Sequence, residues 1–290
     1  MSQTTQRISA AHAGTVGVGR YTVNRLGYGA MRITGDGIWG PPADRDESLR
    51  VLRRALELDV NFIDTADAYG PEVSEELIAE ALHPYPEGLV VGTKAGLVRP
   101  GPGHWEPDGS PDHLRQAVEG SLRRLRVDRL QLLQFHRPDP KVPFAESVGT
   151  LVELQRQGKI EHIGLCNVGR RQLEEALGLT PIVSVQNRYN LTDRDSEAVV
   201  DACQEQGIAF IPWFPLASGR ITEAGGALDQ VAGRHGASVG QVALAWLLHR
   251  APVMLPIPGT SKVAHLEQNV AAAGLKLDAA DMEALERAAA

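Results

Sequence analysis

Short apolar runs alternate with longer segments of helical periodicity along almost the whole chain. A short apolar run that ends in polar or turn-forming residues is typical of a buried strand, and apolar residues spaced three and four apart are typical of a helix that buries one face. Strands are predicted at residues 26–31, 61–63, 89–94, 130–135, 160–165, 181–186, 208–212 and 253–257. Helices are predicted at about residues 44–60, 74–82, 111–126, 144–157, 169–177, 193–206, 225–235, 238–249, 261–273 and 278–288.

Each predicted strand is followed by helix, so the strands are expected to run parallel with right-handed crossovers. Eight such strands in 290 residues predict an α/β fold, the (β/α)8 TIM barrel. Residues 14–23 predict a short N-terminal β-hairpin, and residues 278–288 predict an extra C-terminal helix. The rival is an open doubly wound sheet, but Gly27-Tyr28-Gly29 lacks the third glycine and the helix of a dinucleotide-binding turn. Those glycines indicate that another segment approaches the first strand closely.

The chain has no Pro-, Ser- or charge-rich linker and no low-complexity segment, which favours a single domain. A hydrophobic content of 43% is enough to build one large core. Residues 1–13 are predicted to form a flexible N-terminal tail, so the single barrel domain is expected to span residues 14–290.

The formal net charge of −7 gives no broad attraction to nucleic acid or to an anionic membrane surface. Two cysteines, Cys166 and Cys203, are too few for a disulfide framework and lack metal-ligand spacing, which favours a reducing cytoplasm. Residues 1–13 lack the apolar run of a secretory signal, and no stretch is apolar enough to span a membrane. We expect a cytoplasmic protein, a monomer or weak homo-oligomer, that binds neither nucleic acid nor membrane.

Four titratable side chains lie at or just beyond the ends of three consecutive predicted strands: Asp64 and Tyr69, then Lys94, then His136. In a barrel the carboxyl ends of the strands face a shared site. Lys94 is predicted to lower the pKa of Tyr69, Asp64 to hold Lys94 charged, and His136 to orient a substrate oxygen. Together they would protonate an oxygen as negative charge grows on it, as in carbonyl reduction.

Each of these residues has a plainer interpretation when taken alone. A strand-end aspartate such as Asp64 more often caps the next helix. A loop tyrosine such as Tyr69 usually packs, a lysine is usually solvated, and His136 could satisfy the backbone of its own loop. The coincidence of four such groups at matching strand ends favours the catalytic interpretation. No metal-ligand cluster and no paired-carboxylate site is recognised in the sequence.

Several ordered motifs resemble those of the aldo-keto reductases. They are Asn61-Phe62-Ile63-Asp64-Thr65-Ala66 with Tyr69-Gly70, then Thr93-Lys94, Leu132-x-x-Phe135-His136, Gly164-Leu165-Cys166-Asn167, Gln186-x-x-Tyr189-Asn190 and Ile257-Pro258-Gly259-Thr260-Ser261. The resemblance covers nearly the whole chain. It implies a barrel reductase that uses NADPH, with Asp64, Tyr69, Lys94 and His136 as the catalytic residues and Tyr69 as the acid.

The resemblance also implies a set of cofactor-binding residues. Asn167 and Gln186 would hold the nicotinamide amide, with Cys166 where the family has serine, and Trp213 would stack on the ring. The pyrophosphate and the adenosine end would bind residues that follow later in the chain: Leu216, Ser218, Gly219 and Arg220, then Pro258, Gly259, Thr260, Ser261, Lys262, Gln268 and Asn269. His265 stands where many relatives have an arginine for the 2′-phosphate, so NADH is a less favoured alternative to NADPH.

Two tryptophans in predicted loops, Trp39 and Trp105, are candidates for substrate selectivity, although both could simply pack on the barrel rim. The segments 26–31, 40–42 and 263–266 resemble a bacterial branch of the family that includes pyridoxal reductases. That branch suggests pyridoxal, or a related small or aromatic aldehyde, as the substrate. An alternative function is an NADPH-binding sensor or auxiliary subunit with negligible turnover, which the complete catalytic set argues against.

Overall fold

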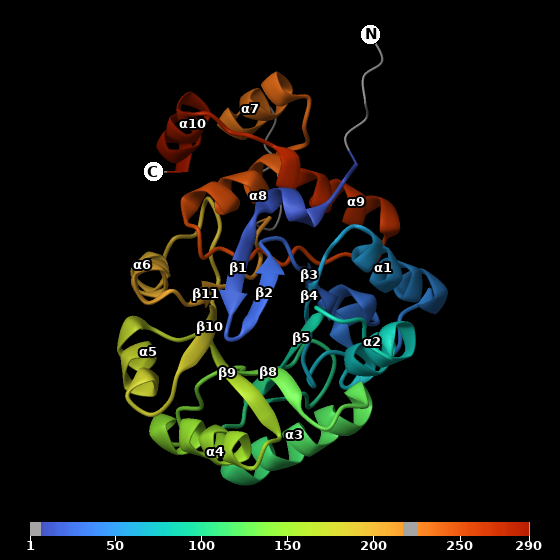
Figure 1. Cartoon of the computed structure of the whole chain (residues 1–290), viewed down its shortest axis with the longest axis vertical. Helices are drawn as coiled ribbons and strands as arrows, with labels where there is room; N and C mark the ends of the chain where they lie inside the picture. The colour runs from blue at the N-terminus through green and yellow to red at the C-terminus, as the bar shows by residue number, and fades with distance from the viewer. Residues whose placement is uncertain (1–6, 217–225, 290) are drawn as a thin grey trace.

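The computed structural model describes residues 7–216 and 226–289. Seven parallel strands form one sheet in the order β11-β10-β9-β8-β5-β4-β3. The sheet curls around on itself with helices on its outer side (Figure 1). Its strands are β3 (Tyr28–Gly29), β4 (Phe62–Asp64), β5 (Val90–Ala95), β8 (Leu130–Phe135), β9 (Ile160–Cys166), β10 (Ile182–Gln186) and β11 (Ala209–Phe210).

Residues 253–257, predicted as the eighth strand, close the barrel between β11 and β3. On one side, Phe210 N donates to Val253 O at 2.9 Å and Leu255 N donates to Phe210 O at 2.8 Å. On the other side, Gly27 N donates to Pro256 O at 2.9 Å. A Cβ atom on Gly29 would lie 2.7 Å from the carbonyl oxygen of Ile257, which explains why glycine occupies the first strand. The (β/α)8 barrel prediction is confirmed.

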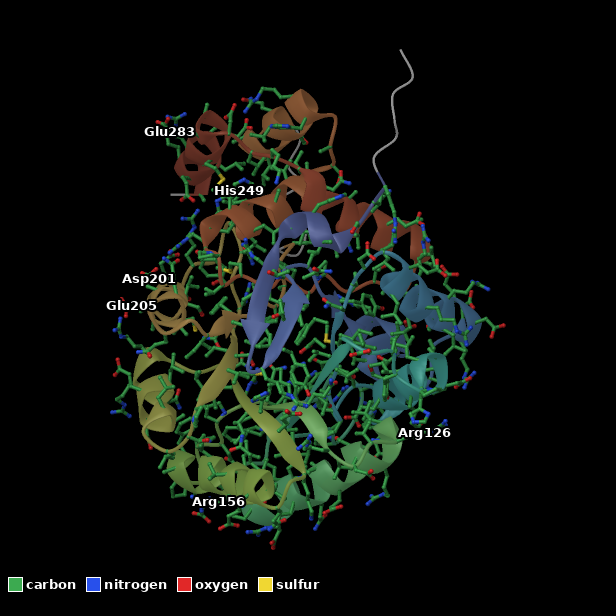
Figure 2. The ribbon with its side chains drawn as sticks, viewed as in Figure 1. Arg126, Arg156, Asp201, Glu205, His249 and Glu283 are labelled. Atoms are coloured by element: carbon green, nitrogen blue, oxygen red, sulfur yellow. The ribbon has the colours of Figure 1, made fainter. Side chains whose placement is uncertain are left out.

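The ten helices of the described residues lie close to their predicted positions. For example, Asp44 accepts from Glu47 N at 2.9 Å and starts α1, and Ser110 with Pro111 starts α3. Their outer faces carry charged side chains such as Arg156 and Glu283, which point away from the sheet (Figure 2). The helices are α1 (Arg45–Glu57), α2 (Val73–Leu82), α3 (Pro111–Leu125), α4 (Phe144–Arg156), α5 (Arg170–Leu177), α6 (Glu197–Gln206), α7 (Ala227–His235), α8 (Val239–Arg250), α9 (Val263–Ala271) and α10 (Ala279–Ala289).

The predicted N-terminal hairpin closes the amino-terminal mouth of the barrel. Strands β1 (Thr15–Val18) and β2 (Tyr21–Asn24) pair antiparallel and lie across that mouth (Figure 1). Their valines pack on apolar side chains from inside the barrel, among them Phe62, Val90 and Leu255. With one end closed by this hairpin, a ligand reaches the barrel interior from the carboxyl ends of the strands.

The end of the predicted tail is packed against the barrel rather than free. Ala10 is fully buried and its N–H donates to Leu58 O at 2.8 Å, while Ser9 caps the 3-10 helix η1 (Ala10–Ala13). Small side chains allow this close packing, and sequence polarity alone does not reveal it. Residues 1–6 lie outside the described part of the chain.

Three features differ from the sequence prediction. Helix α6 begins at Glu197 rather than near residue 193, because residues 190–193 form a turn. The loop after β5 contains a hairpin of β6 (Leu97–Val98) and β7 (Glu106–Pro107), and the loop after β3 contains the 3-10 helices η2 (Ala30–Ile33) and η3 (Asp36–Ile38).

In the part of the chain that the structure describes, no helix has the length and apolar content to cross a membrane.

Candidate active site

The predicted catalytic residues Asp64, Tyr69 and Lys94 meet at the carboxyl ends of β4 and β5. Lys94 Nζ donates to Asp64 Oδ2 at 2.6 Å and to Thr65 O at 2.8 Å, and lies 3.1 Å from the Tyr69 hydroxyl. Lys94 is fully buried, and Asp64 and Tyr69 are nearly so. A buried ammonium is therefore fixed between a carboxylate and a phenol, and cannot exchange these partners for water.

The alternation of side chains along β5 explains why Lys94 points into the barrel. The preceding residue, Thr93, points outward and its hydroxyl bonds to Glu75 of helix α2. In a strand, successive side chains face opposite sides of the sheet, so Lys94 must face the barrel interior. The register places Lys94 beside Gln134 of β8 and Asp64 beside Gly92 of β5, which brings the charged ends together.

Two glutamine side chains complete the surroundings of Asp64, and one of them was missed in the sequence. Gln134 Nε2 and Gln186 Nε2 donate to Asp64 Oδ1 at 3.0 and 2.7 Å. Gln186 was predicted only as a cofactor ligand. One signal that could have found Gln134 is Gly164 on the neighbouring strand, where a Cβ would meet Ser184 Oγ at 2.2 Å and the Gln134 side chain at 3.0 Å. A glycine beside a polar residue in an otherwise apolar strand indicates that the polar side chain needs that space.

The pKa of Tyr69 differs from the prediction. Burial raises it to about 12, and the attraction of Lys94 lowers it only in part, while Asp64 raises it further. Burial alone would lower the pKa of Lys94, but the charges of Asp64 and Tyr69 raise it above its usual range. The prediction of a lowered Tyr69 pKa is wrong because it left out desolvation. Tyr69 is protonated and Lys94 charged at neutral pH, which is the state a proton donor requires.

His136 follows β8 and lies beside the phenol, with its ring centroid 5.9 Å from that of Tyr69. Burial, together with the charges of Lys94 and Arg137, holds the pKa of His136 well below its usual range. Its Nδ1 atom is buried and has no hydrogen-bond partner among the described residues. His136 also lines the cavity described below, so a neutral imidazole beside Tyr69 is suited to contact a polar group of a ligand.

A cavity of about 490 Å³ opens from these residues toward the carboxyl ends of the strands. Trp105 forms part of the cavity wall, and the indole ring lies edge-on to Tyr69 at 6.2 Å between centroids. Most of the cavity lining is apolar, including Met31, Phe214 and Ile257. The sequence-predicted residues that line this cavity are Asp64, Tyr69, Trp105, His136, Asn167, Gln186, Trp213, Leu216, Pro258 and Gly259.

Asn167 joins His136 to Trp213, the predicted stacking residue. Its Nδ2 donates to His136 O at 3.0 Å, and its Oδ1 accepts from Trp213 Nε1 at 3.1 Å. Asn167 adopts a positive φ of 58°, which asparagine tolerates better than most residues. Cys166 does not line the cavity: its thiol is buried against Gln134 Oε1, and burial raises its pKa above the usual range. Its contact with a ligand remains a prediction.

The remaining predicted residues lie away from this cavity or outside the described chain. Trp39 packs on Arg99 beside the cavity, with the guanidinium carbon 5.5 Å from its ring centroid. Thr260 Oγ1 accepts from Lys262 N at 3.1 Å at the start of α9. Ser261, Lys262, Gln268 and Asn269 belong to the same segment. Ser218, Gly219 and Arg220 fall outside the described residues, which also contain no cluster of potential metal ligands.

A sequence model of the aldo/keto reductase family matches residues 25–290. The chain belongs to this family. An uncharacterized oxidoreductase of Schizosaccharomyces pombe is 53% identical over 270 residues, covering 93% of this chain and 88% of the relative. The pyridoxine 4-dehydrogenase of Escherichia coli is 46% identical over 270 residues, covering 91% of this chain and 94% of that enzyme.

Solved structures of aldo-keto reductases have the same fold. A thermostable aldo-keto reductase in complex with an inhibitor gives a TM-score of 0.81 at 32% identity and covers 94% of this chain and 98% of its own. An aldo-keto reductase of Klebsiella pneumoniae in complex with NADPH gives 0.78 at 27% identity, with 94% of each chain covered. The protein is therefore an oxidoreductase of the aldo-keto reductase family.

Proposed function

We propose that this aldo-keto reductase reduces an aldehyde or ketone to an alcohol, with Tyr69 as the proton donor. The observation that carries the proposal is the contact of Lys94 Nζ with both Asp64 and the Tyr69 hydroxyl. A phenol that gives up its proton leaves a phenolate, and a fixed ammonium beside it stabilises that charge.

The cofactor of this enzyme is NADPH, which supplies the hydride that reduces the carbonyl carbon. The cavity fits such a cofactor: Asn167 and Gln186 line it with amide groups, and the neighbouring wall is largely apolar and includes the indole of Trp213. Arg32 lines the same cavity, and the N-terminus of α9 begins a few residues after Gly259, so positive charge is available for phosphate groups. We assign the adenosine end to Thr260, Ser261, Lys262, Gln268 and Asn269.

The chain's own residues move the proton. The Tyr69 hydroxyl gives its proton to the carbonyl oxygen as that oxygen becomes negative, and Lys94 holds the resulting phenolate. Asp64 keeps Lys94 charged and in place, helped by Gln134 and Gln186. His136 is neutral and donates a hydrogen bond to the same oxygen. One hydride and one proton convert the carbonyl to the alcohol, and the proton on Tyr69 is restored from solvent.

We propose pyridoxal, or a related aromatic aldehyde, as the substrate. The relative from Escherichia coli is a pyridoxine 4-dehydrogenase, and pyridoxine and pyridoxal differ by oxidation of one alcohol. The largely apolar cavity and the indole of Trp105 suit a flat ring. Steady-state assays with pyridoxal, 4-nitrobenzaldehyde and methylglyoxal test this choice. No detectable reduction of pyridoxal would reject this substrate and leave the reductase assignment in place.

Replacement of Tyr69 by phenylalanine tests the proton donor. Tyr69→Phe is expected to lower kcat by at least about 10²-fold, since general acids contribute on this scale. Binding of NADPH, followed by fluorescence titration, is expected to stay within about twofold. Tyr85→Phe is the matched control, because the Tyr85 hydroxyl donates to Leu125 O and lies outside the 490 Å³ cavity. Near-normal turnover by Tyr69→Phe would remove Tyr69 from this role.

A further inference from the structure

Arg99, in the loop that follows β5, connects the three loops around the substrate end of the cavity. Its guanidinium donates to four backbone carbonyls: Nε to His104 O at 2.9 Å, Nη1 to Ile38 O at 2.8 Å and Ala68 O at 2.9 Å, and Nη2 to Gly37 O at 3.0 Å. Gly37 and Ile38 follow β3, Ala68 follows β4, and His104 follows β5. One side chain therefore links loops from three different strands.

Two of these carbonyls lie next to residues that face the cavity. Ala68 directly precedes Tyr69, and His104 directly precedes Trp105. The Arg99 guanidinium carbon also lies 3.7 Å from the centroid of the Trp105 ring. Because Trp105 meets the edge of Tyr69 on the cavity side, Arg99 supports the indole and also holds the loop that carries the tyrosine.

The geometry requires arginine rather than a general positive charge. Arg99 forms no ion pair within the described residues, and each of its hydrogen bonds goes to a backbone carbonyl. A planar guanidinium can hold several acceptors in one plane and stack on an indole at the same time, whereas an ammonium cannot. Arg99 does not line the 490 Å³ cavity and instead faces a separate outer cavity of about 640 Å³, so it acts on a substrate through Trp105.

We propose that Arg99 is a positioning residue that makes this enzyme select flat aromatic aldehydes, because it holds Trp105 as a rigid wall beside Tyr69. The inference rests on the proposed reductase function and goes beyond it. An aromatic substrate gains a stacking surface only if the indole is already fixed when the substrate arrives. A small aliphatic aldehyde needs only the catalytic hydroxyl, so it depends less on this wall.

The experiment compares two substrates in two variants. In Arg99→Met, the ratio of kcat/KM for 4-nitrobenzaldehyde to that for methylglyoxal is expected to fall about tenfold, mainly through KM for the aromatic aldehyde. The Kd for NADPH is expected to stay within about twofold. Arg99→Lys keeps the charge but cannot bind four carbonyls, so it is expected to show an intermediate ratio. An unchanged ratio in both variants overturns the proposal.

A matched control and a double-mutant cycle separate selectivity from general damage. Arg123→Met removes an exposed arginine that lines the outer 640 Å³ cavity but holds no loop, and is expected to keep the wild-type ratio. In a Trp105→Leu background, Arg99→Met is expected to change the ratio by less than about twofold, because the wall is already lost. Additive effects of the two substitutions would overturn an action through Trp105.

Acrylamide quenching of tryptophan fluorescence tests the same wall without turnover. Arg99→Met is expected to increase quenching more in a chain that has Trp105 than in the Trp105→Leu background, where Trp39 is the indole that still contacts Arg99. Equal changes in the two backgrounds overturn the proposal. A wild-type protein that oxidises NADPH with neither aldehyde contradicts the proposed function alone, because the quenching result still decides the role of Arg99.

Discussion

Asp64 and Asp67 lie three residues apart and are both nearly buried, with exposed fractions of 2% and 8%, yet their surroundings are opposite. Asp64 accepts hydrogen bonds from Lys94 and from two glutamine amides. Asp67 Oδ1 has no hydrogen-bond partner among the described residues. Burial, and next the charge of Glu75, raises the pKa of Asp67 well above its usual range.

The comparison shows that burial alone does not identify a catalytic carboxylate. A buried carboxylate stays charged when an opposite charge and donors replace the water it has lost. Asp64 has these partners, and they include the Lys94 ammonium that contacts the Tyr69 hydroxyl. Asp67 faces the outer cavity of about 640 Å³ rather than the cavity that Tyr69 and His136 line. The set of partners around Asp64, rather than its burial, is what supports the proposed site.

Removal of Lys94 should have the largest effect, because it leaves Asp64 buried without its opposite charge. Lys94→Met is expected to lower kcat by at least about 10²-fold, since the phenolate of Tyr69 loses its stabilising charge. The free energy of unfolding is expected to fall by about 3–5 kcal/mol, the usual cost of breaking a buried ion pair. Urea unfolding and steady-state kinetics at neutral pH measure the two effects.

Lys159→Met serves as the control for this substitution. Lys159 pairs with Glu119 at the surface, and such pairs contribute about 0–1 kcal/mol. The control is expected to unfold at nearly the wild-type urea concentration and to keep its kcat. If Lys94→Met also unfolded like the wild type, the buried pair would not distinguish Asp64 from Asp67 energetically.

The features of the sequence that repeat with a fixed period were sufficient to predict the fold. Short apolar runs placed the strands, and the residues just after them placed Asp64, Lys94 and His136 at one end of the barrel. The segment 253–257 forms a bridge and single hydrogen bonds rather than a regular strand, yet it closes the barrel where the pattern predicted it. The alternation of apolar and polar residues is a local feature of the chain, so the sequence is sufficient to recognise the strands and helices that it predicts.

Other features depend on what the folded chain places around a residue, and these were missed. The Tyr69 pKa depends on burial, which no local pattern gives. Gln134 was hidden in an apolar strand, and the contacts of Arg99 join segments from three loops. Asp67 stands in the same motif as Asp64, and only the structure shows that Asp64 has hydrogen-bond donors around it whereas Asp67 Oδ1 has none among the described residues.

Replacement of Asp67 should have the smallest effect on activity and sharpens the comparison through its pH dependence. Asp67 has a higher pKa in the folded than in the unfolded protein, where about 3.9 is usual. Below that value both states are protonated, and as pH rises the unfolded state ionises first. Ionisation of the unfolded state lowers the free energy of unfolding, until the folded protein also ionises at its higher pKa.

Asp67→Asn removes this titration, so the wild type should lose stability relative to the variant as the pH rises above about 4. Relative to the wild type, the variant is therefore expected to be more stable at pH 8 than at pH 4, with kcat within about twofold. Urea unfolding of both proteins at pH 4 and pH 8 measures the difference. A difference that does not grow with pH would mean that Asp67 is ionised in the folded protein and that its surroundings do not raise its pKa.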